Sequence, residues 1–161
     1  MGYRWQVDAD DPIKIRARKD QLEALLRAEI PKRKVRFIAE ESKIGKATVA
    51  SALASASNPQ IRWKNISMTP SRDAAGITEV LKNRPGHPGY ETMGRWIESR
   101  MPGDEIREDF FIEQTLRITG NAQSILMLLG DMHADAVGDK LRQMGHCVST
   151  NHDLLPARRW E

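Results

Sequence analysis

Short apolar runs alternate with stretches of helical periodicity along the 161 residues of this chain. Runs of apolar or β-branched residues between turn signals are typical of buried strands, and apolar residues spaced three and four apart indicate helices. The segments that fit a strand are 35–40, 61–68, 124–130 and 146–150. The segments that fit a helix are 13–30, 44–56, 69–81, 90–100, 104–119 and 134–144. This order constrains the fold strongly, because strands that alternate with helices form a parallel sheet covered on both faces.

We therefore predict an α/β fold, a single three-layer domain over residues 1–161 with a mostly parallel sheet of about four strands flanked by helices. Residues 1–12 are expected to form an N-terminal arm and residues 151–161 a C-terminal tail. Residues 124–130, SILMLLG, are apolar on both faces, so we expect them to form the central strand. Residues 61–68 alternate in polarity and are expected nearer an edge of the sheet.

The composition is that of an ordinary globular protein, with 40% hydrophobic and 29% charged residues. The single cysteine, Cys147, excludes an intramolecular disulfide and favours a reducing compartment. The longest apolar run, residues 125–129, is far too short to cross a bilayer, and no early segment has the pattern of a signal peptide. We therefore expect a cytoplasmic protein without a membrane partner.

The formal net charge is +3, and much of the positive excess lies in residues 32–36 and 158–159. Nucleic-acid-binding domains usually gather basic residues on one face, often beside stacking aromatics. Aromatic residues make up only 6% of this chain and it carries no nucleic-acid-binding motif, so a nucleic-acid partner is not expected. We interpret the basic residues as solvated charges that flank a strand rather than as a nucleic-acid-binding surface.

Acidic and imidazole groups follow two of the predicted strands. Glu40 and Glu41 end the first strand, and Asp131 and His133 follow the run SILMLLG. Open parallel sheets bind ligands beyond the carboxyl ends of their strands. If the two strands are neighbours, Glu40, Asp131 and His133 would be able to hold a divalent metal ion, and all four residues would be able to act as catalytic acids or bases. The alternative is that Asp131 caps the next helix and Glu41 faces solvent.

Arg107 lies in the first turn of a predicted helix, where the helix dipole disfavours a cation. A partner outside the helix would offset this, either an anionic substrate or a carboxylate at a strand tip. Arg107 is therefore a further candidate catalytic residue, and the alternative is a solvated side chain.

Two short motifs resemble known sites but lack their partners. Residues 130–135, GDMHAD, resemble the GDxHG element of calcineurin-type metallophosphatases, yet the segment between His133 and the later TNHD of residues 150–153 is too short for the other metal-binding elements. Residues 44–48, IGKAT, resemble the end of a phosphate-binding P-loop. Glu40 stands there in place of the first glycine, so ATP binding is not expected.

The order of motifs resembles the superfamily of erythromycin esterase, ChaN and TraB-like proteins. Its elements here are AEE at residues 39–41, RE at 107–108, GDMH at 130–133 and KLRQMGHCV at 140–148. The resemblance implies that Gly130 and His133 form the C-terminal G-x-x-H element, that Arg107 is the arginine of the family, and that Glu40 or Glu41 is its acid. Members include macrolide esterases, metal-dependent peptidase-like proteins, and haem-associated and regulatory proteins.

The chain departs from that family at its start. Members usually open with a strand that carries its own histidine in a G-x-x-H pattern, whereas the first histidine here is His87, in a loop rich in proline and glycine. This departure implies a reduced or inactive member, unless His87 substitutes for the missing residue.

Two functional hypotheses follow. The first is a small hydrolase-like enzyme in which Glu40 or Glu41, Asp131 and His133 act as metal ligands or acid–base groups and Arg107 holds an anionic small molecule. The second is a non-catalytic ligand-binding or regulatory domain, in the form of a homodimer. The first is supported if the carboxylates of Glu40 or Glu41 and of Asp131 lie in a pocket within about 6 Å of the His133 imidazole, and strand tips more than about 12 Å apart would exclude a shared site.

Overall fold

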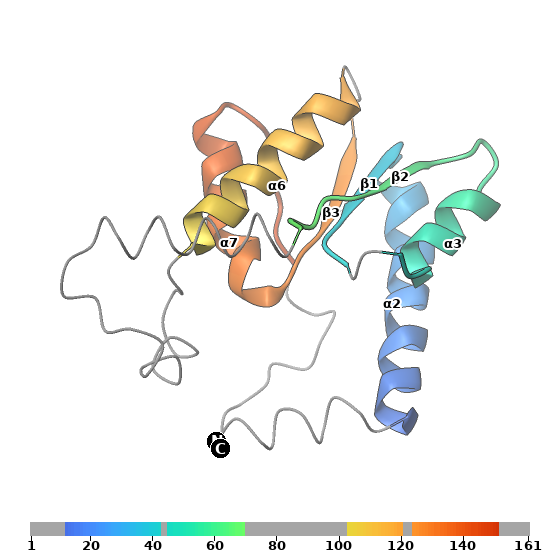
Figure 1. Ribbon diagram of the computed structural model, residues 1–161. Helices are drawn as coiled ribbons and strands as arrows, with labels where there is room; N and C mark the ends of the chain where they lie inside the picture. The colour runs from blue at the N-terminus through green and yellow to red at the C-terminus, as the bar shows by residue number, and fades with distance from the viewer. Residues whose placement is uncertain (1–11, 43–44, 70–102, 121–123, 152–161) are drawn as a thin grey trace, which may run out of the picture.

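The computed structural model describes residues 12–42, 45–69, 103–120 and 124–151 (Figure 1). In chain order its elements are α2 (Pro12–Lys32), β1 (Phe37–Glu40), α3 (Val49–Ala56), β2 (Arg62–Asn65), α6 (Asp104–Thr119), β3 (Ile125–Leu128) and α7 (Asp131–Gln143). These elements confirm four of the predicted helices and three of the predicted strands. The predicted helices at residues 69–81 and 90–100 lie outside the described residues, apart from Thr69.

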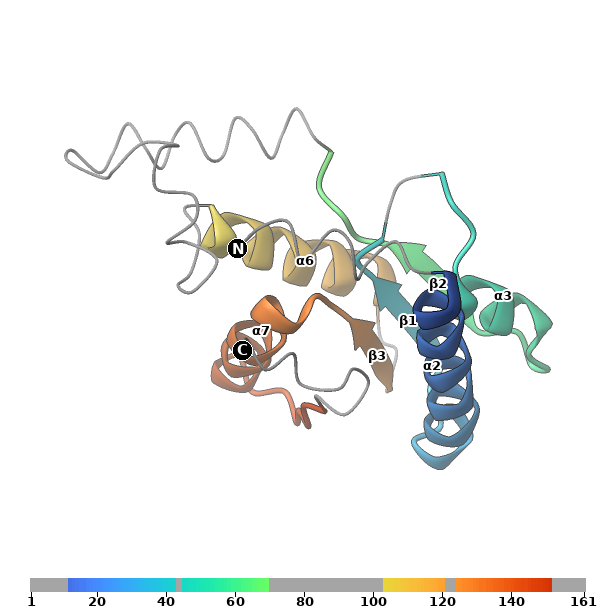
Figure 2. The same ribbon diagram turned by 90° about the horizontal axis from the view of Figure 1, so that it is seen from below.

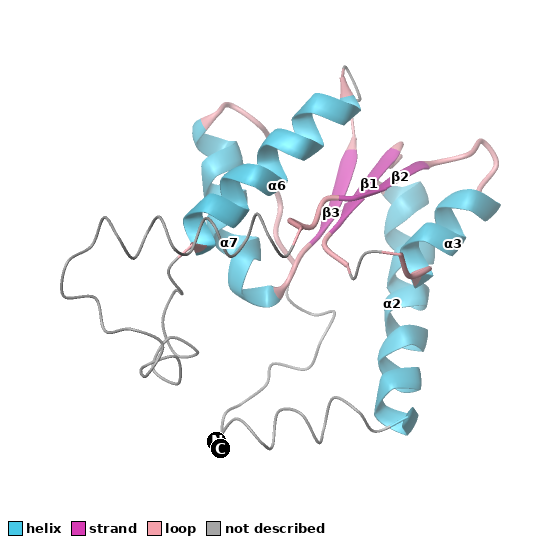
Figure 3. Ribbon diagram, viewed as in Figure 1, coloured by secondary structure: helices cyan, strands magenta, loops and turns pink. Residues whose placement is uncertain are grey.

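The strands form a parallel sheet in the order β2-β1-β3. In the register of the sheet, Ile38 of β1 lies between Trp63 of β2 and Leu126 of β3. Helices cover both faces: α2 and α3 lie on one side, and α6 and α7 on the other (Figures 2 and 3). The predicted three-layer α/β fold is therefore confirmed.

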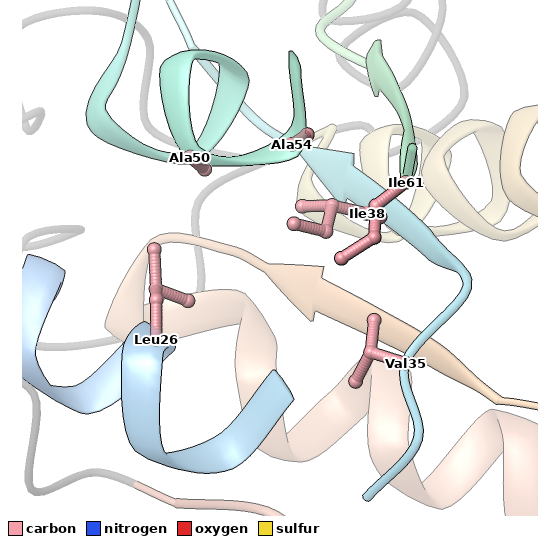
Figure 4. Close-up of a cluster of buried hydrophobic side chains, with 6 residues drawn as sticks. All are labelled: Leu26, Val35, Ile38, Ala50, Ala54 and Ile61. Atoms are coloured by element: carbon pink, nitrogen blue, oxygen red, sulfur yellow. The ribbon is translucent and has the colours of Figure 1, made fainter. Parts of the chain in front are cut away.

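Each face of the sheet carries its own hydrophobic core because successive side chains of a strand point to opposite faces. The core under α2 and α3 consists of Leu26, Val35, Ile38, Ala50, Ala54 and Ile61 (Figure 4). The core under α6 and α7 consists of Phe37, Ala39, Ile66, Phe111, Ile112 and Val137.

Within the described residues the sheet has three strands, and the prediction of a fourth at residues 146–150 is wrong. This segment packs beside α7 instead of joining the sheet. The Arg142 guanidinium donates to the Val148 carbonyl, and the Ser149 hydroxyl accepts from Arg33. Apart from the half-buried Val148, its residues are exposed, so it has too little apolar surface to displace these polar contacts.

The central strand is β1, and the prediction that residues 124–130 form it is wrong. All four residues of β1 are buried, whereas those of β3 are half-buried. The apolar character of β3 on both faces has another cause. Leu126 and Leu128 pack against the α2/α3 core, and Ile125 and Met127 against the α6/α7 core. An outer strand between two helical layers thus has the same pattern as a central one. The expected outer position of β2 is confirmed.

The helix boundaries follow local signals. Thr48 and Ser51 form a reciprocal capping box at the start of α3. Glycines flank α6, with Gly103 at φ 91° before it and Gly120 at φ 54° after it, conformations that a side chain would strain. In the described part of the chain, no helix is long and apolar enough to span a membrane.

Candidate functional site

The chain changes direction across the sheet at the ends of β1 and β3. It leaves β1 toward α3 on one face and leaves β3 toward α7 on the other face. Such a divergence between neighbouring strands is the topological switch point at which open α/β sheets bind ligands. The two ends are tied together, because the Glu41 amide donates to the Leu128 carbonyl at 2.9 Å.

Glu41, Gly130 and His133 meet at this switch point. The Gly130 amide donates to Oε2 of Glu41 at 3.0 Å, and the His133 amide donates to the Gly130 carbonyl at 2.9 Å. A Cβ placed on Gly130 would lie 3.4 Å from Oε2 of Glu41 and 3.8 Å from Cδ2 of His133. The carboxylate and the imidazole thus border the same glycine. Glu41 is partly buried and bonded, which departs from the alternative in which it faces solvent.

Glu40 is directed away from this site. Its side chain accepts hydrogen bonds from Thr48 Oγ1 at 2.6 Å and from Trp63 Nε1 at 2.7 Å. Both partners belong to the α2/α3 side, whereas His133 packs in the α6/α7 layer. The expected convergence of Glu40 with His133 does not form, because neighbouring residues of a strand point to opposite faces and only Glu41 faces α7. Glu40 instead ties β1 to β2 and to the start of α3.

His133 is paired with Glu108 of α6. Its Nδ1 lies 3.3 Å from Glu108 Oε1, and its ring meets the Phe111 ring edge-on at a centroid distance of 5.6 Å. Glu108 is fully buried and His133 is 8% exposed. An ionised carboxylate can only accept a hydrogen bond, so in the neutral imidazole Nδ1 carries the proton and Nε2 keeps its lone pair. Cδ2, one of the two ring carbons bonded to Nε2, would lie 3.8 Å from a Cβ placed on Gly130.

Glu108 was not among the sequence-based candidates, although the sequence contains a signal for it. The buried residues of α6 follow helical spacing and are Asp104, Glu108, Phe111, Ile112, Thr115 and Thr119. A glutamate on such a stripe must find a polar partner when the helix packs. A search for charged residues on apolar helix faces would have found it.

Arg107 binds an acid of its own helix. Its guanidinium lies 3.2 Å from Asp104, one turn earlier, and the two side chains are 17% and 4% exposed. This ion pair offsets the unfavourable position of the arginine near the start of α6. The anionic partner that the sequence suggested for Arg107 is therefore met, at least in part, within the helix.

Of the residues expected to bind a metal ion, Glu40 and His133 are not brought together. Among the described side chains, no group of three or more His, Cys, Asp or Glu residues is placed to hold a metal ion. Glu40 lies on the opposite face of the sheet from His133, and the side chain of Asp131 lies outside what the structure describes. Asp131 is the first residue of α7, and the N-cap position belongs to Gly130 rather than to Asp131.

Comparison with protein-family models, curated proteins and solved structures finds no match to this chain. The chemistry of the switch point therefore has to be judged from its own residues. These are a partly buried carboxylate, a glycine turn, and an imidazole that a buried carboxylate orients.

Proposed function

We propose that this chain is a hydrolase-like enzyme in which His133 acts as a general base at the carboxyl edge of the sheet. The observation that carries the proposal is the pairing of His133 Nδ1 with the buried Glu108 at a topological switch point. A histidine whose one nitrogen is held by a carboxylate, and whose other nitrogen is free to accept a proton, is the acid–base unit of many hydrolases.

The proton path follows from this tautomer. Nε2 of His133 accepts a proton from a water molecule or hydroxyl that attacks the carbonyl of an ester or amide. The new bond forms between that oxygen and the carbonyl carbon, and the Glu108 carboxylate stabilises the resulting imidazolium. The imidazolium then returns its proton to the leaving group when the carbon–heteroatom bond breaks.

The charges beside the imidazole favour a particular kind of small molecule. Glu41 and Glu108 both flank His133, and their carboxylates disfavour an anion at the ring. Arg107, the cation expected to offset them, already pairs with Asp104. A neutral ester with hydroxyl groups therefore suits this position better than an anionic substrate, and Glu41 would accept from one of those hydroxyls.

The relationship to the erythromycin esterase, ChaN and TraB-like superfamily belongs to the same proposal. Gly130 and His133 provide the motif, and Glu41 is a better counterpart of the family acid than Glu40, because its carboxylate lies beside Gly130. The chain has no histidine before His87, a departure from the family's G-x-x-H pattern that favours the non-catalytic candidate, so the enzymatic proposal assigns the proton transfer to His133 and Glu108 alone.

The second candidate is a non-catalytic ligand-binding or regulatory domain that forms a homodimer. Its support is that both strand-tip glutamates also hold the fold: Glu40 binds Thr48 and Trp63, and Glu41 binds the Gly130 amide. In that case the Glu108–His133 pair would serve as a polar link between α6 and α7. With either function we propose a cytoplasmic location, which fits the single cysteine.

The test is hydrolysis of a panel of chromogenic acetyl, butyryl and glycosyl esters by the wild type and by His133→Gln. Removal of a general base usually lowers the rate by about 10²–10⁴-fold. His146→Gln is the matched control, because His146 is exposed just beyond α7 and far from Glu108 in the chain. A folded His133→Gln variant with wild-type activity would refute the enzymatic role. A wild type that binds but does not cleave the esters would favour the ligand-binding domain.

A further inference from the structure

We infer that Lys140 is a positioning residue that fixes the Glu108 carboxylate and, through it, the tautomer of His133. The inference rests on the proposed function, since it concerns the same imidazole. It names a third member of the unit, Lys140, to which the motifs of the sequence assigned no role.

His133 and Lys140 hold Glu108 from the same helix. They are seven residues apart on α7, so two helical turns separate them and both face α6. Nδ1 of His133 lies 3.3 Å from Oε1 of Glu108, and Nζ of Lys140 lies 3.7 Å from Oε2. Each carboxylate oxygen thus contacts a different donor, which defines the rotation of the carboxylate plane.

Lys140 is itself anchored on α6. Its ammonium donates to Oδ1 of Asp109 and lies 3.5 Å from the backbone carbonyl of Glu105. Its side chain is 26% exposed, while that of Asp109 is 63% exposed. The ammonium therefore lies at the boundary between solvent and the buried carboxylate, where three oxygens of α6 hold it in place.

The tautomer of His133 depends on this arrangement. A neutral histidine side chain in water prefers the proton on Nε2, so the Nδ1–H form needs a well-placed acceptor. Without Lys140, Oε2 of Glu108 loses this ion pair, and the plane of the carboxylate is fixed less firmly toward the imidazole. The share of the Nδ1–H form would then fall, and with it the share of molecules whose Nε2 can accept a proton.

The test compares Lys140→Met and Lys140→Arg with the wild type. Protein labelled with ¹⁵N-histidine reports the tautomer through the ring nitrogen shifts, recorded where the ring is neutral, and His133→Gln identifies the signals. We expect Nδ1–H in the wild type, a shift toward Nε2–H in Lys140→Met, and recovery in Lys140→Arg. Ester hydrolysis should fall about 10–100-fold in Lys140→Met, in kcat rather than in KM.

Arg142→Met is the matched control. Arg142 lies two residues further along α7, but it pairs with Asp139 of the same helix and with the Val148 carbonyl rather than with α6. Its removal should leave the tautomer and the activity unchanged. Circular dichroism of each variant establishes that α7 is folded, and Lys140→Gln, which also removes the ammonium, takes the place of Lys140→Met if that variant unfolds.

The outcomes separate this inference from the proposed function. A wild-type tautomer in folded Lys140→Met overturns the role of Lys140 while His133 remains the base. Loss of Nδ1–H in Lys140→Met, combined with full activity of His133→Gln, supports the positioning role and overturns the enzymatic proposal. An Nε2–H tautomer in the wild type overturns both.

Discussion

Replacing Glu40 with alanine should destabilise the fold, because this carboxylate joins three elements. It accepts from Thr48 Oγ1 at 2.6 Å and from Trp63 Nε1 at 2.7 Å, and the residue is 8% exposed. A hydrogen bond to a charged group contributes about 1.5–3 kcal/mol. Thr48 is partly exposed, and its hydroxyl can bond to water once the carboxylate is removed. The free energy of unfolding should therefore fall by about 3 kcal/mol rather than by the sum of two full hydrogen bonds. Thr48 would also lose the contact that orients its capping hydroxyl.

Glu40→Gln is the matched variant that keeps the shape and removes the charge. Both donors meet the same oxygen, Oε2, so an amide oxygen in that place still accepts both hydrogen bonds. We expect a loss of about 1 kcal/mol, the difference between charged and neutral acceptors. Urea unfolding measures both values, and the thermal midpoint of Glu40→Ala should fall by about 6–12 °C.

Two results would contradict this reasoning. If Glu40→Ala loses less than about 1 kcal/mol, or if glutamine is as damaging as alanine, the shared oxygen does not join the elements. A double-mutant cycle with Trp63→Phe isolates the indole bond, and its coupling energy should reach about 1 kcal/mol. Glu40→Gln should also leave ester hydrolysis unchanged, because Glu40 lies on the opposite face from His133. Loss of activity in a fully stable variant would return Glu40 to the catalytic site.

Three further measurements address other parts of the structure. Within the described residues, Ser42 Oγ is the one buried side-chain polar atom without a hydrogen-bond partner. Ser42→Ala should therefore raise the free energy of unfolding, measured in urea, by about 1 kcal/mol. A decrease would show that the hydroxyl is satisfied. Gly130 has φ −56° and ψ 142°, a conformation that alanine adopts freely. Gly130→Ala should therefore change the free energy of unfolding by less than about 1 kcal/mol. A larger loss would mean that the turn cannot accept the 3.4 Å contact between the new Cβ and Oε2 of Glu41. A hydrogen bond from Arg33 holds the pKa of the partly buried Glu29 carboxyl below its usual value of 4.5. The contribution of this contact to folding stability is complete above pH 4.5 and is lost as the pH falls through the lowered pKa. Arg33→Gln should therefore raise the pKa of Glu29 in a carboxyl ¹³C NMR titration. An unchanged pKa would exclude the Arg33 hydrogen bond as the cause.

The layers of the fold could be predicted from the sequence because periodicity reports burial. The stripe of Leu22 and Leu26 on α2, and the run at residues 125–128, both reflect which faces are covered. Strand order could not be predicted in this way. An apolar pattern on both faces requires two helical layers, and a strand at the edge of the sheet satisfies that requirement as well as a central one does.

The candidate site was predicted in part for a related reason. The switch-point rule directs attention to the carboxyl ends of the strands, and the pairing of β1 with β3 in the structure meets the condition that the two strands are neighbours, so Glu41 lies beside Gly130. It does not distinguish Glu40 from Glu41, because it concerns the edge of the sheet, whereas neighbouring residues of a strand point to opposite faces. Glu108 comes from a distant helix, and only the packing of α6 against α7 brings it to the imidazole.

The charged cluster between α6 and α7 buries the Glu108 carboxylate at a cost in desolvation. Transfer of a carboxylate from water into the interior is unfavourable, and buried ionic groups can often be replaced by apolar residues of similar volume without loss of stability. Glu108 lies on the helix face that packs Phe111 and Ile112 into the core, and a leucine there would pack equally well. A leucine cannot hold the proton of His133 on Nδ1, however. The acid–base proposal gives the fully buried carboxylate a catalytic role, whereas a structural link between the helices rests on its ion pairs with His133 and Lys140 alone to offset its desolvation.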